Sequence, residues 1–375
     1  MSNTSNTCLV RIWDLPTRVF HGLLILTFGF AWLTEGDSRY LDMHVFAGYA
    51  FFALLGFRVL WGFVGSHYAK FRQFACGWSS VWQYTITLLT SKRQHFIGHN
   101  PAGSWAIFLI LGLGFVVSIT GLLTLGGEER HGPLAGLISF HWGTFYHQWH
   151  EISAWALLAL VFVHITGVFA ESVLHRENLV KAMISGFKPV AQSTLNDVPN
   201  YRFIAALIVL TFVGSATWYF KGYITQTEEK PYIPFTGPHL VQNDLWQTAC
   251  GDCHLAYHPS LLPARSWQKM LAEQENHFEE DLYLDEEMVT ALNAYAVANA
   301  AETAPTEAGW QINQSIPANQ VPLRITQTHY WKEQHEKIPE AIWKHPKVNF
   351  PGQCETCHLD AFEGTFEDAA MHYPK

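Results

Sequence analysis

The stretch Trp149-His-Glu-Ile-Ser-Ala-Trp-Ala-Leu-Leu-Ala-Leu-Val-Phe-Val-His-Ile-Thr-Gly-Val-Phe-Ala170 decides the fold of the first half of the chain. It is almost entirely apolar, and about 20 such residues form a helix long enough to cross a bilayer. Two histidines, His150 and His164, interrupt it. The stretch therefore predicts a membrane-spanning helix with ionisable side chains, and such groups inside a bilayer are candidates for function.

Four more apolar runs mark further spans: Val19–Thr34, His44–Val64, Ser104–Leu125 and Tyr201–Tyr219. Arg11 and Arg18 precede the first run, as in a signal peptide, but no small-residue cleavage site follows it. We therefore expect an uncleaved first span and five crossings in all. Between the second and third spans, the amphipathic stretch Trp78–Thr90 predicts a helix that lies on the membrane surface.

Charge divides the chain into two unlike halves. Charged residues are only 15% of the chain, against roughly 25% in a typical soluble domain. Residues 1–221 contain 14 basic and 10 acidic side chains, whereas residues 222–375 contain 9 and 22, a net charge of −13. The acidic half would repel phosphate, which excludes a nucleic-acid binder. An apolar content of 49% excludes a disordered chain.

Basic residues predict the orientation of the spans, because they accumulate on the cytoplasmic side of membrane proteins. The outer loops before the fifth span hold only Arg39 and Arg130. With the N-terminus inside, the inner segments hold ten basic residues: Arg11, Arg18, Lys70, Arg72, Lys92, Arg93, Arg176, Lys181, Lys188 and Arg202. Five crossings then place the acidic half outside the cytoplasm.

The histidines of the spans form two pairs at two depths. His150 and His164 are 14 residues apart, so they share a helix face and lie about 21 Å apart along its axis. His21 lies near the inner end of the first span, level with His164, and His44 near the outer end of the second, level with His150. Each pair could hold one haem iron from both sides. Interfacial histidines without metal are the simpler alternative, but the matched depths favour haem.

Several neighbouring residues have competing roles. His147 stands one turn before His150 and competes with it as a ligand, and His141 does so more weakly. Arg18 and Arg58 are candidates for contacts with haem propionates, or else positive anchors at the inner surface. Histidines outside the spans are expected to be solvated: His67, His95, His99, His131 and His175.

Residues 8–190 resemble the bacterial cytochrome b561 family, which is related to the b subunits of nickel-iron hydrogenases. The matching pieces, in order, are Val10–Asp14 with Arg18 and His21; His44 with Gly48, Arg58, Trp61 and Gly62; Gly98–Pro101; His150-Glu151 with His164; and Glu177–Met183 through Gly186. The resemblance implies a four-helix bundle that holds two b haems, ligated in the pairs given above, and electron exchange with membrane quinone.

The acidic half contains one motif twice, Cys250-Gly-Asp-Cys253-His254 and Cys354-Glu-Thr-Cys357-His358. C-x-x-C-H is the signature of covalent c-type haem attachment, in which both thiols bond the porphyrin and the following His ligates the iron. A zinc site built from the two Cys pairs is the alternative, but the His directly after each pair favours haem. Bacterial c-type attachment occurs outside the cytoplasm, which agrees with the predicted orientation. Cys8 and Cys76 fall in inner segments, where thiols stay reduced.

Each c haem needs a sixth ligand unless one site is open. The candidates are His258, His277, His329, His335, His345, His372, Met270, Met288 and Met371. The tether from His254 to His258 is short for reaching the opposite face of the haem. His277 follows His254 by 23 residues and His335 precedes His358 by 23, so both have the reach, and their pairing stays open.

Residues 240–375 resemble the dihaem cytochrome c family. The match consists of Cys250–His254, Leu261–Pro263 with Trp267, His277-Phe278, Arg324–Thr326 with Trp331 and His335, and Cys354–His358 with Ala361 and Gly364. It implies bis-histidine ligation with His277 and His335 as the distal ligands. Glu279 departs from the family, which has Gly after His-Phe. Within this part we expect short helices, most clearly Asp285–Ala298, and a loop over Ala300–Gln320.

The expected fold is all-α: a transmembrane four-helix haem-binding bundle, a fifth membrane span and a small, mostly helical dihaem cytochrome c domain. The expected boundaries are 1–190 for the bundle, 191–222 for the fifth span, 223–239 for a proline-containing linker and 240–375 for the periplasmic domain. The N-terminus would be cytoplasmic, in a bacterial inner membrane.

The expected function is electron transfer between membrane quinone, two b haems, two c haems and a soluble periplasmic redox protein, as in a quinol:acceptor oxidoreductase. The acidic outer domain predicts a basic docking face on that protein. One alternative is a terminal reductase of a small molecule at an open c haem, and another is an anchor subunit of a larger dehydrogenase or hydrogenase. Self-association of the chain is compatible with all three roles.

Overall fold

In the computed structural model, the described residues are 7–35, 40–88, 94–191, 197–224, 237 and 239–374. The chain divides into two compact units. Unit 1 comprises residues 1–121 and 148–221, and unit 2 comprises residues 122–147 and 222–375. The basic residues Arg39, Lys92 and Arg93, and all of the expected linker segment Thr225–Pro238 except Gly237, lie outside the described residues.

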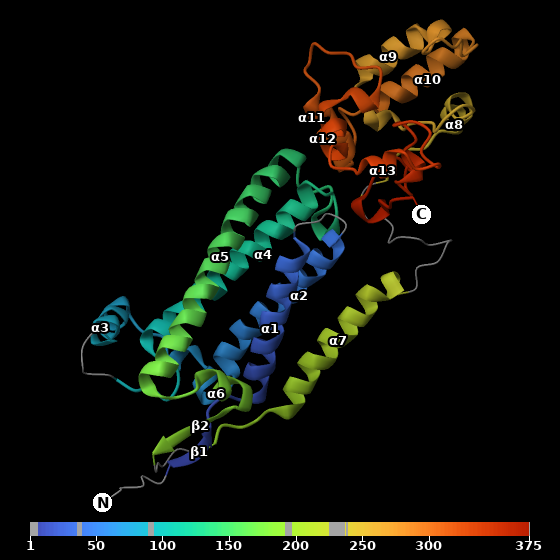
Figure 1. The fold of residues 1–375 in the computed structure, drawn as a ribbon. Coiled ribbons are helices and arrows are strands. Elements are labelled where there is room, and N and C mark those ends of the chain that lie inside the picture. Colours follow the sequence, from blue (N-terminus) through green and yellow to red (C-terminus); the bar gives the residue numbers. More distant parts are fainter. Residues whose placement is uncertain are drawn as a thin grey trace, which may run out of the picture. The chain divides into compact units, whose positions relative to one another are not determined.

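All five predicted membrane spans are helices in the structure (Figure 1). Each is long and apolar enough to cross a bilayer: α1 (Leu15–Thr34), α2 (Leu41–Val64), α4 (Pro101–Gly127), α5 (Phe140–His175) and α7 (Arg202–Ile224). The fourth span is much longer than its apolar run, because α5 continues as a helix at both ends to a total of 36 residues.

A polar cap fixes where the first helix begins. The Asp14 carboxylate accepts a hydrogen bond from the Thr17 backbone N–H at 2.7 Å, which caps α1. The same carboxylate accepts a bond of 3.2 Å from Trp61 Nε1 near the end of α2. Asp14 is fully buried, so this contact joins the inner ends of two antiparallel helices. At the start of α4, Asn100 Oδ1 accepts from the Gly103 N–H at 2.6 Å, which caps that helix.

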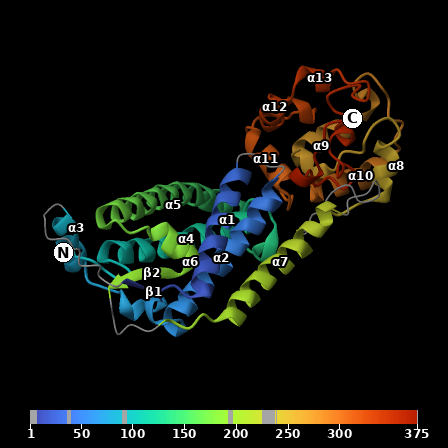
Figure 2. The same ribbon diagram turned by 60° about the horizontal axis from the view of Figure 1, so that its bottom comes forward.

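The core of unit 1 lies between α2, α4 and α5. Its buried members are Phe51, Leu55, Leu111 and Leu157, and Leu24 and Phe28 of α1 pack against them. The two views show α1 and α2 running side by side (Figures 1 and 2). These four helices form the predicted bundle.

The fifth span packs along one side of α2. Tyr219 Oη on α7 donates to the Asp42 carbonyl at 2.6 Å, and the Phe46 ring lies 4.9 Å from that of Tyr219. At the opposite end of α7, Tyr201 lies 5.3 Å from Trp61. The helix is therefore held against the bundle by aromatic contacts at both ends.

A short sheet that was not predicted from the sequence has its first strand just before α1. β1 (Thr7–Arg11) pairs antiparallel with β2 (Phe187–Ala191), with Thr7 opposite Ala191. The helix α6 (Leu179–Ser185) leads into β2 and ends at Gly186, whose φ of +89° favours glycine. The predicted surface helix is present as α3 (Trp78–Leu88), with Trp78 and Trp82 exposed. Its place at the membrane surface stays a prediction.

The acidic part of unit 2 is built from short helices, as predicted. They are α8 (Asp244–Cys250), α9 (Ala264–Ala272), α10 (Glu286–Ala298), α11 (Glu307–Ser315), α12 (His329–His335) and α13 (Glu340–Trp343). Their shared core includes Trp246, Leu262, Trp267, Leu292 and Ile312. Asp285 caps α10 by accepting from the Met288 N–H at 2.8 Å.

The loop predicted over Ala300–Gln320 is wrong in part, because α11 forms within it. Thr306 provides the cap, with its hydroxyl 3.4 Å from the Gly309 N–H. Ile312 is buried in the core of the domain. The polar composition of this segment hid a helix that tertiary packing stabilises.

Candidate functional site

The histidine pair His44 and His150 is brought together by two helices of the bundle. His44 lies on α2 and His150 on α5, and their ring centroids are 6.0 Å apart. Two metal–nitrogen bonds of about 2 Å and two ring radii of about 1.1 Å place the centroids of opposed axial imidazoles about 6 Å apart. The pair therefore fits a single iron held between the two rings.

Backbone carbonyls orient both of these rings. His44 Nδ1 donates to the Ala31 carbonyl of α1 at 3.0 Å, and His150 Nδ1 donates to the Val117 carbonyl of α4 at 2.9 Å. A ligand histidine usually donates its second N–H in this way, which fixes the tautomer and leaves the other nitrogen for the metal. A Cβ on Gly121 of α4 would lie 2.9 Å from His150 Cε1, so glycine leaves room for this ring.

The inner pair, His21 on α1 and His164 on α5, lies within range of direct electrostatic interaction. Of the two arginines considered for propionates, Arg18 donates through Nη1 to the Ile184 carbonyl at 2.8 Å. Arg58 is 5% exposed and stacks over the Phe71 ring at 4.8 Å. Its Nη1 is buried without a hydrogen-bond partner among the described residues. Arg58 therefore has a free donor on the inner side of the bundle.

Two more histidine pairs occur in unit 2. The ring centroids of His254 and His277 are 6.3 Å apart, and those of His335 and His358 are 6.2 Å apart. Both separations match the spacing of opposed iron ligands. The sequence left the pairing open, and the structure brings His277 to the first motif and His335 to the second.

The second C-x-x-C-H motif has the local geometry that haem attachment needs. At the second motif, the Cys357 and His358 N–H groups both donate to the Cys354 carbonyl, at 3.0 and 2.8 Å, which forms one helical turn. The four thiols are free. No group of three or more His, Cys, Asp or Glu side chains that could hold a metal ion occurs among the described residues. The Cys pairs therefore do not combine into the alternative zinc site in this part of the chain.

Two of the competing candidate ligands, His147 and His258, form hydrogen bonds with other residues. His147 Nδ1 bonds to Glu128 Oε2 at 2.6 Å. His258 is 3% exposed, and its Nε2 donates to the Val241 carbonyl at 3.1 Å while its Nδ1 accepts from the Ser260 N–H. Both rings thus have structural roles.

The expectation that the remaining histidines are solvated is wrong for most of them. His99 lies between the rings of Trp13, at 4.8 Å, and Phe74, at 4.3 Å. His131 and His175 are partly buried and bond to Glu367 and Glu171 at 3.1 Å. His95 bonds to Glu177 at 3.1 Å but its side chain is 55% exposed, as expected. The partners are distant in sequence in two of these pairs, so no local pattern could reveal them.

The structure explains the family's glycine at position 279. Glu279 has a φ of +82°, and Phe278 before it a φ of +55°. Both values are left-handed, a conformation that costs residues with a Cβ roughly 1–2 kcal/mol. The Glu279 N–H bonds to Asn276 Oδ1 at 3.2 Å, which supports the turn next to His277.

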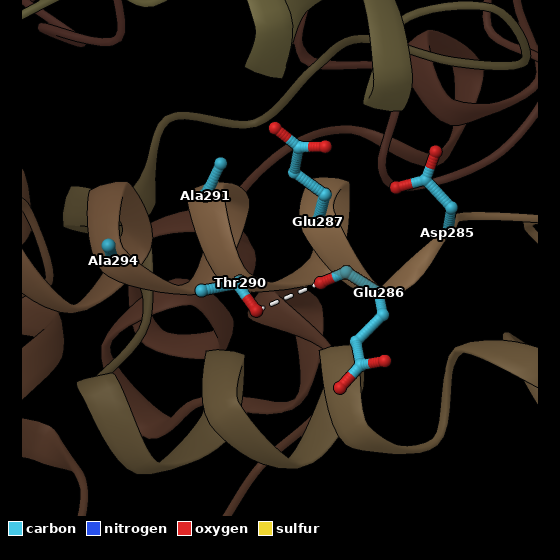
Figure 3. Close-up of a pocket in the computed structure, with 6 residues that line it drawn as sticks. All are labelled: Asp285, Glu286, Glu287, Thr290, Ala291 and Ala294. Carbon is cyan, nitrogen blue, oxygen red and sulfur yellow. Dashed lines mark hydrogen bonds between the residues drawn. The ribbon is translucent and has the colours of Figure 1, made fainter.

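A shallow hollow on α10 is separate from the histidine pairs. Figure 3 shows the residues that line it: Asp285, Glu286, Glu287, Thr290, Ala291 and Ala294. The three carboxylates extend from the first turn of the helix and are exposed. The hollow therefore contributes to the acidic surface of the domain.

Comparisons with known proteins give separate matches for the membrane half and the acidic half of the chain. Residues 12–186 match the family described as prokaryotic cytochrome b561, and residues 246–366 match dihaem cytochrome c. A probable Ni/Fe-hydrogenase B-type cytochrome subunit of Azotobacter vinelandii is 31% identical over 213 residues, which cover 48% of this chain and 88% of that protein. The corresponding probable Ni/Fe-hydrogenase 1 subunit of Escherichia coli (strain K12) is 22% identical, with coverages of 47% and 89%. The solved diheme cytochrome c from Rhodobacter sphaeroides is 34% identical and covers 34% of this chain and 100% of that chain, with a TM-score of 0.31.

Proposed function

The chain belongs to the prokaryotic cytochrome b561 family and carries a dihaem cytochrome c domain, and from this we propose that it connects the membrane quinone pool with a soluble periplasmic redox protein. Its family membership makes it an integral membrane electron-transfer protein that binds haem b and haem c. We propose two haems of each kind. The observation that carries the proposal is the recurrence of one spacing, 6.0 to 6.3 Å, in three histidine pairs.

The residues assigned to the b haems are His21 with His164 and His44 with His150. Those assigned to the c haems are Cys250, Cys253 and His254 with distal His277, and Cys354, Cys357 and His358 with distal His335. When bound, haem supplies an iron that accepts and donates one electron at a time. The chain's own residues hold and orient that iron.

Hydrogen bonds to backbone carbonyls support this assignment both in the bundle and in the dihaem cytochrome c domain. The imidazoles of His44, His150 and His335 each donate Nδ1 to a carbonyl. Each ring is thereby fixed in one tautomer, with Nε2 available to a metal. Arg58, with its unpartnered Nη1, and Arg18, whose Nε is likewise buried without a partner among the described residues, are both candidates for contacts with a propionate of the inner b haem.

The topology is part of the proposal. The bundle would occupy residues 1–190 and the fifth span residues 191–222, followed by a linker over 223–239 and a periplasmic domain over 240–375. The excess of basic residues on one side supports a cytoplasmic N-terminus in a bacterial inner membrane. The quinone would exchange electrons with the bundle and the soluble protein with the periplasmic domain.

Purified full-length protein in lipid nanodiscs tests this function. A pyridine haemochrome assay should give two b and two c haems per chain, with only the b haems extracted by acid acetone. Mixing with a short-chain ubiquinol should then reduce both kinds of haem, seen as separate absorbance bands in a stopped-flow spectrometer. A protein whose c haems stayed oxidised while its b haems became reduced would contradict the proposal.

A second function is favoured by the relatives, which are named probable B-type cytochrome subunits of Ni/Fe-hydrogenases. In that role the chain would anchor a hydrogenase and receive its electrons. Mild solubilisation of the untagged protein distinguishes the two. Co-purification of a stoichiometric hydrogenase would favour the anchor, whereas a chain isolated alone with quinol-dependent reduction of its c haems would favour the proposed role.

A further inference from the structure

The segment between α4 and α5 packs against the acidic helices within unit 2. Arg130 Nε donates to the Pro305 carbonyl at 3.0 Å. The Phe140 ring stacks on Trp310 of α11, with centroids 5.1 Å apart and planes at 14°. Arg130 and Phe140 are ten residues apart, and Pro305 and Trp310 are five apart, so the two contacts define one small interface between segment 128–140 and the start of α11.

A hydrogen bond between two acidic side chains lies in this interface. Glu129 of the segment bonds to Glu307 in the first turn of α11. Two carboxylates have no proton to share, so such a bond forms only when one of them is protonated. The pair therefore shares one proton, which either carboxyl can carry.

We propose that the Glu129–Glu307 pair is a proton-dependent latch that holds segment 128–140 on α11. The shared proton links the two carboxyls, and its loss replaces a hydrogen bond with a repulsion between like charges at close range. The aromatic stack of Phe140 on Trp310 and the Arg130 bond guide the segment to its place. The latch decides how tightly it stays there.

Several other charged or titratable groups lie near the pair, and the carboxylates of Glu128, Glu367 and Asp368 favour its protonation. Glu128 lies next to Glu129 on the segment and bonds to His147 of α5. The remaining neighbours from the elements packed around the pair are Arg130, His131, Tyr330 of α12, and Glu367 and Asp368. Acidic groups outnumber basic ones here, so the surroundings favour retention of the proton.

The direction of the pH dependence follows from the same groups. Burial and the neighbouring carboxylates raise the pKa of Glu307 from 4.5 to about 8, and they raise the pKa of Glu129 as well. When segment 128–140 is bound to α11, the Glu129–Glu307 pair therefore retains a proton. When the segment separates, the pair would release that proton. Closure is strongest at acid pH and weakens as the pH rises from about 4.5 through 8, by up to about tenfold per pH unit for one proton.

Hydrogen–deuterium exchange of the full chain in nanodiscs measures the latch directly. Peptides covering residues 128–140 and 303–312 should be protected at pH 5 and exchange at least tenfold faster at pH 9, after scaling for the intrinsic chemical rate. In Glu129→Gln the amide donates without a titratable proton, so protection should be nearly equal at both pH values. Glu307→Gln should behave in the same way, because it removes the other carboxylate.

Glu273→Gln serves as the matched control, since it removes an exposed carboxylate of the same domain and should keep the pH profile of the unaltered chain. Equal protection of the unaltered chain at pH 5 and 9 would overturn the proposal. So would a Glu129→Gln and a Glu307→Gln variant that both lose protection at pH 9 as the unaltered chain does. Haem content and electron transfer do not enter this readout.

Discussion

The partner of one histidine nitrogen distinguishes the proposed metal ligands from a structural histidine in this chain. His44 and His150 each donate Nδ1 to a backbone carbonyl of a neighbouring helix, which fixes the tautomer whose Nε2 can ligate a metal, and their ring centroids are 6.0 Å apart. His147, only one turn from His150, has its Nδ1 against the Glu128 carboxylate. The two residues are alike in sequence context, and only their hydrogen-bond partners separate them.

Replacing one of the outer pair should therefore remove one haem and leave the others. In His44→Ala we expect the ratio of b to c haem to fall from 2:2 to 1:2, because a single imidazole would hold a non-covalent haem weakly. A pyridine haemochrome assay of the purified variant measures the ratio. His147→Ala is the control and should keep the ratio of the unaltered chain. A His44→Ala variant with both b haems would contradict the assignment.

The distal c ligands give a different signature, because the haem stays covalently attached when they are removed. In His335→Ala we expect an open iron site that binds carbon monoxide after reduction, one per chain, visible in the difference spectrum. The unaltered protein should bind almost none, since both c irons would have two histidines. His329→Ala, from the same helix, should remain unreactive. Strong binding by the unaltered protein would instead favour the small-molecule reductase.

Sequence reasoning predicted the histidines of the spans better than those of the loops. Fourteen residues of regular helix relate His150 to His164, so their common face and separation follow from helix geometry alone. His99 has no such periodic relation to Trp13 and Phe74, between which it lies. Its burial depends on how three separate segments meet, which no local pattern encodes.

At the scale of elements, the turn after His277 stores strain. Glu279 holds a φ of +82°, where a Cβ is unfavourable. Glu279→Gly should stabilise the haem domain by about 1 kcal/mol, since the relief of strain exceeds the entropy that glycine adds to the unfolded chain. Chemical denaturation followed by the absorbance of the c haems measures the change.

Glu279→Ala is the matched control, because it removes the same charge but keeps the Cβ. The alanine variant should gain little stability, so the difference in stability between the two variants measures the contribution of backbone strain at position 279. Equal stabilisation by alanine and glycine would mean that relief of charge repulsion, rather than backbone strain, explains the family's glycine at this position.

The elements that sequence reasoning missed share a cause. The five spans were predicted because a bilayer demands long apolar runs, which are visible in any window of sequence. β1 and β2 are five residues each and are separated by more than 170 residues, so neither has a local hairpin signal. α11 is polar and is stabilised by burial of Ile312 in the domain core. Short elements depend on tertiary contacts that composition does not reveal.

At the scale of the whole molecule, the two halves suit two different solvents. Under the proposed function, the apolar, mildly basic half would exchange electrons with a lipid-soluble carrier, and the acidic half with a carrier in water. The net charge of −13 beyond residue 221 is distributed over an outer surface that includes the carboxylates of Asp285, Glu286 and Glu287. A surface of one sign raises the encounter rate with a partner of the opposite sign.

This charge predicts the salt dependence of the outward reaction. The rate of electron transfer from the reduced protein to a basic monohaem cytochrome c should fall at least tenfold between about 10 mM and 150 mM ionic strength, because the Debye length shrinks from about 30 Å to about 8 Å. Stopped-flow absorbance at several salt concentrations measures this rate. An acidic cytochrome of similar potential is the control, and its rate should rise with salt as repulsion is screened. A basic partner whose rate is indifferent to ionic strength would show that docking does not use the acidic surface.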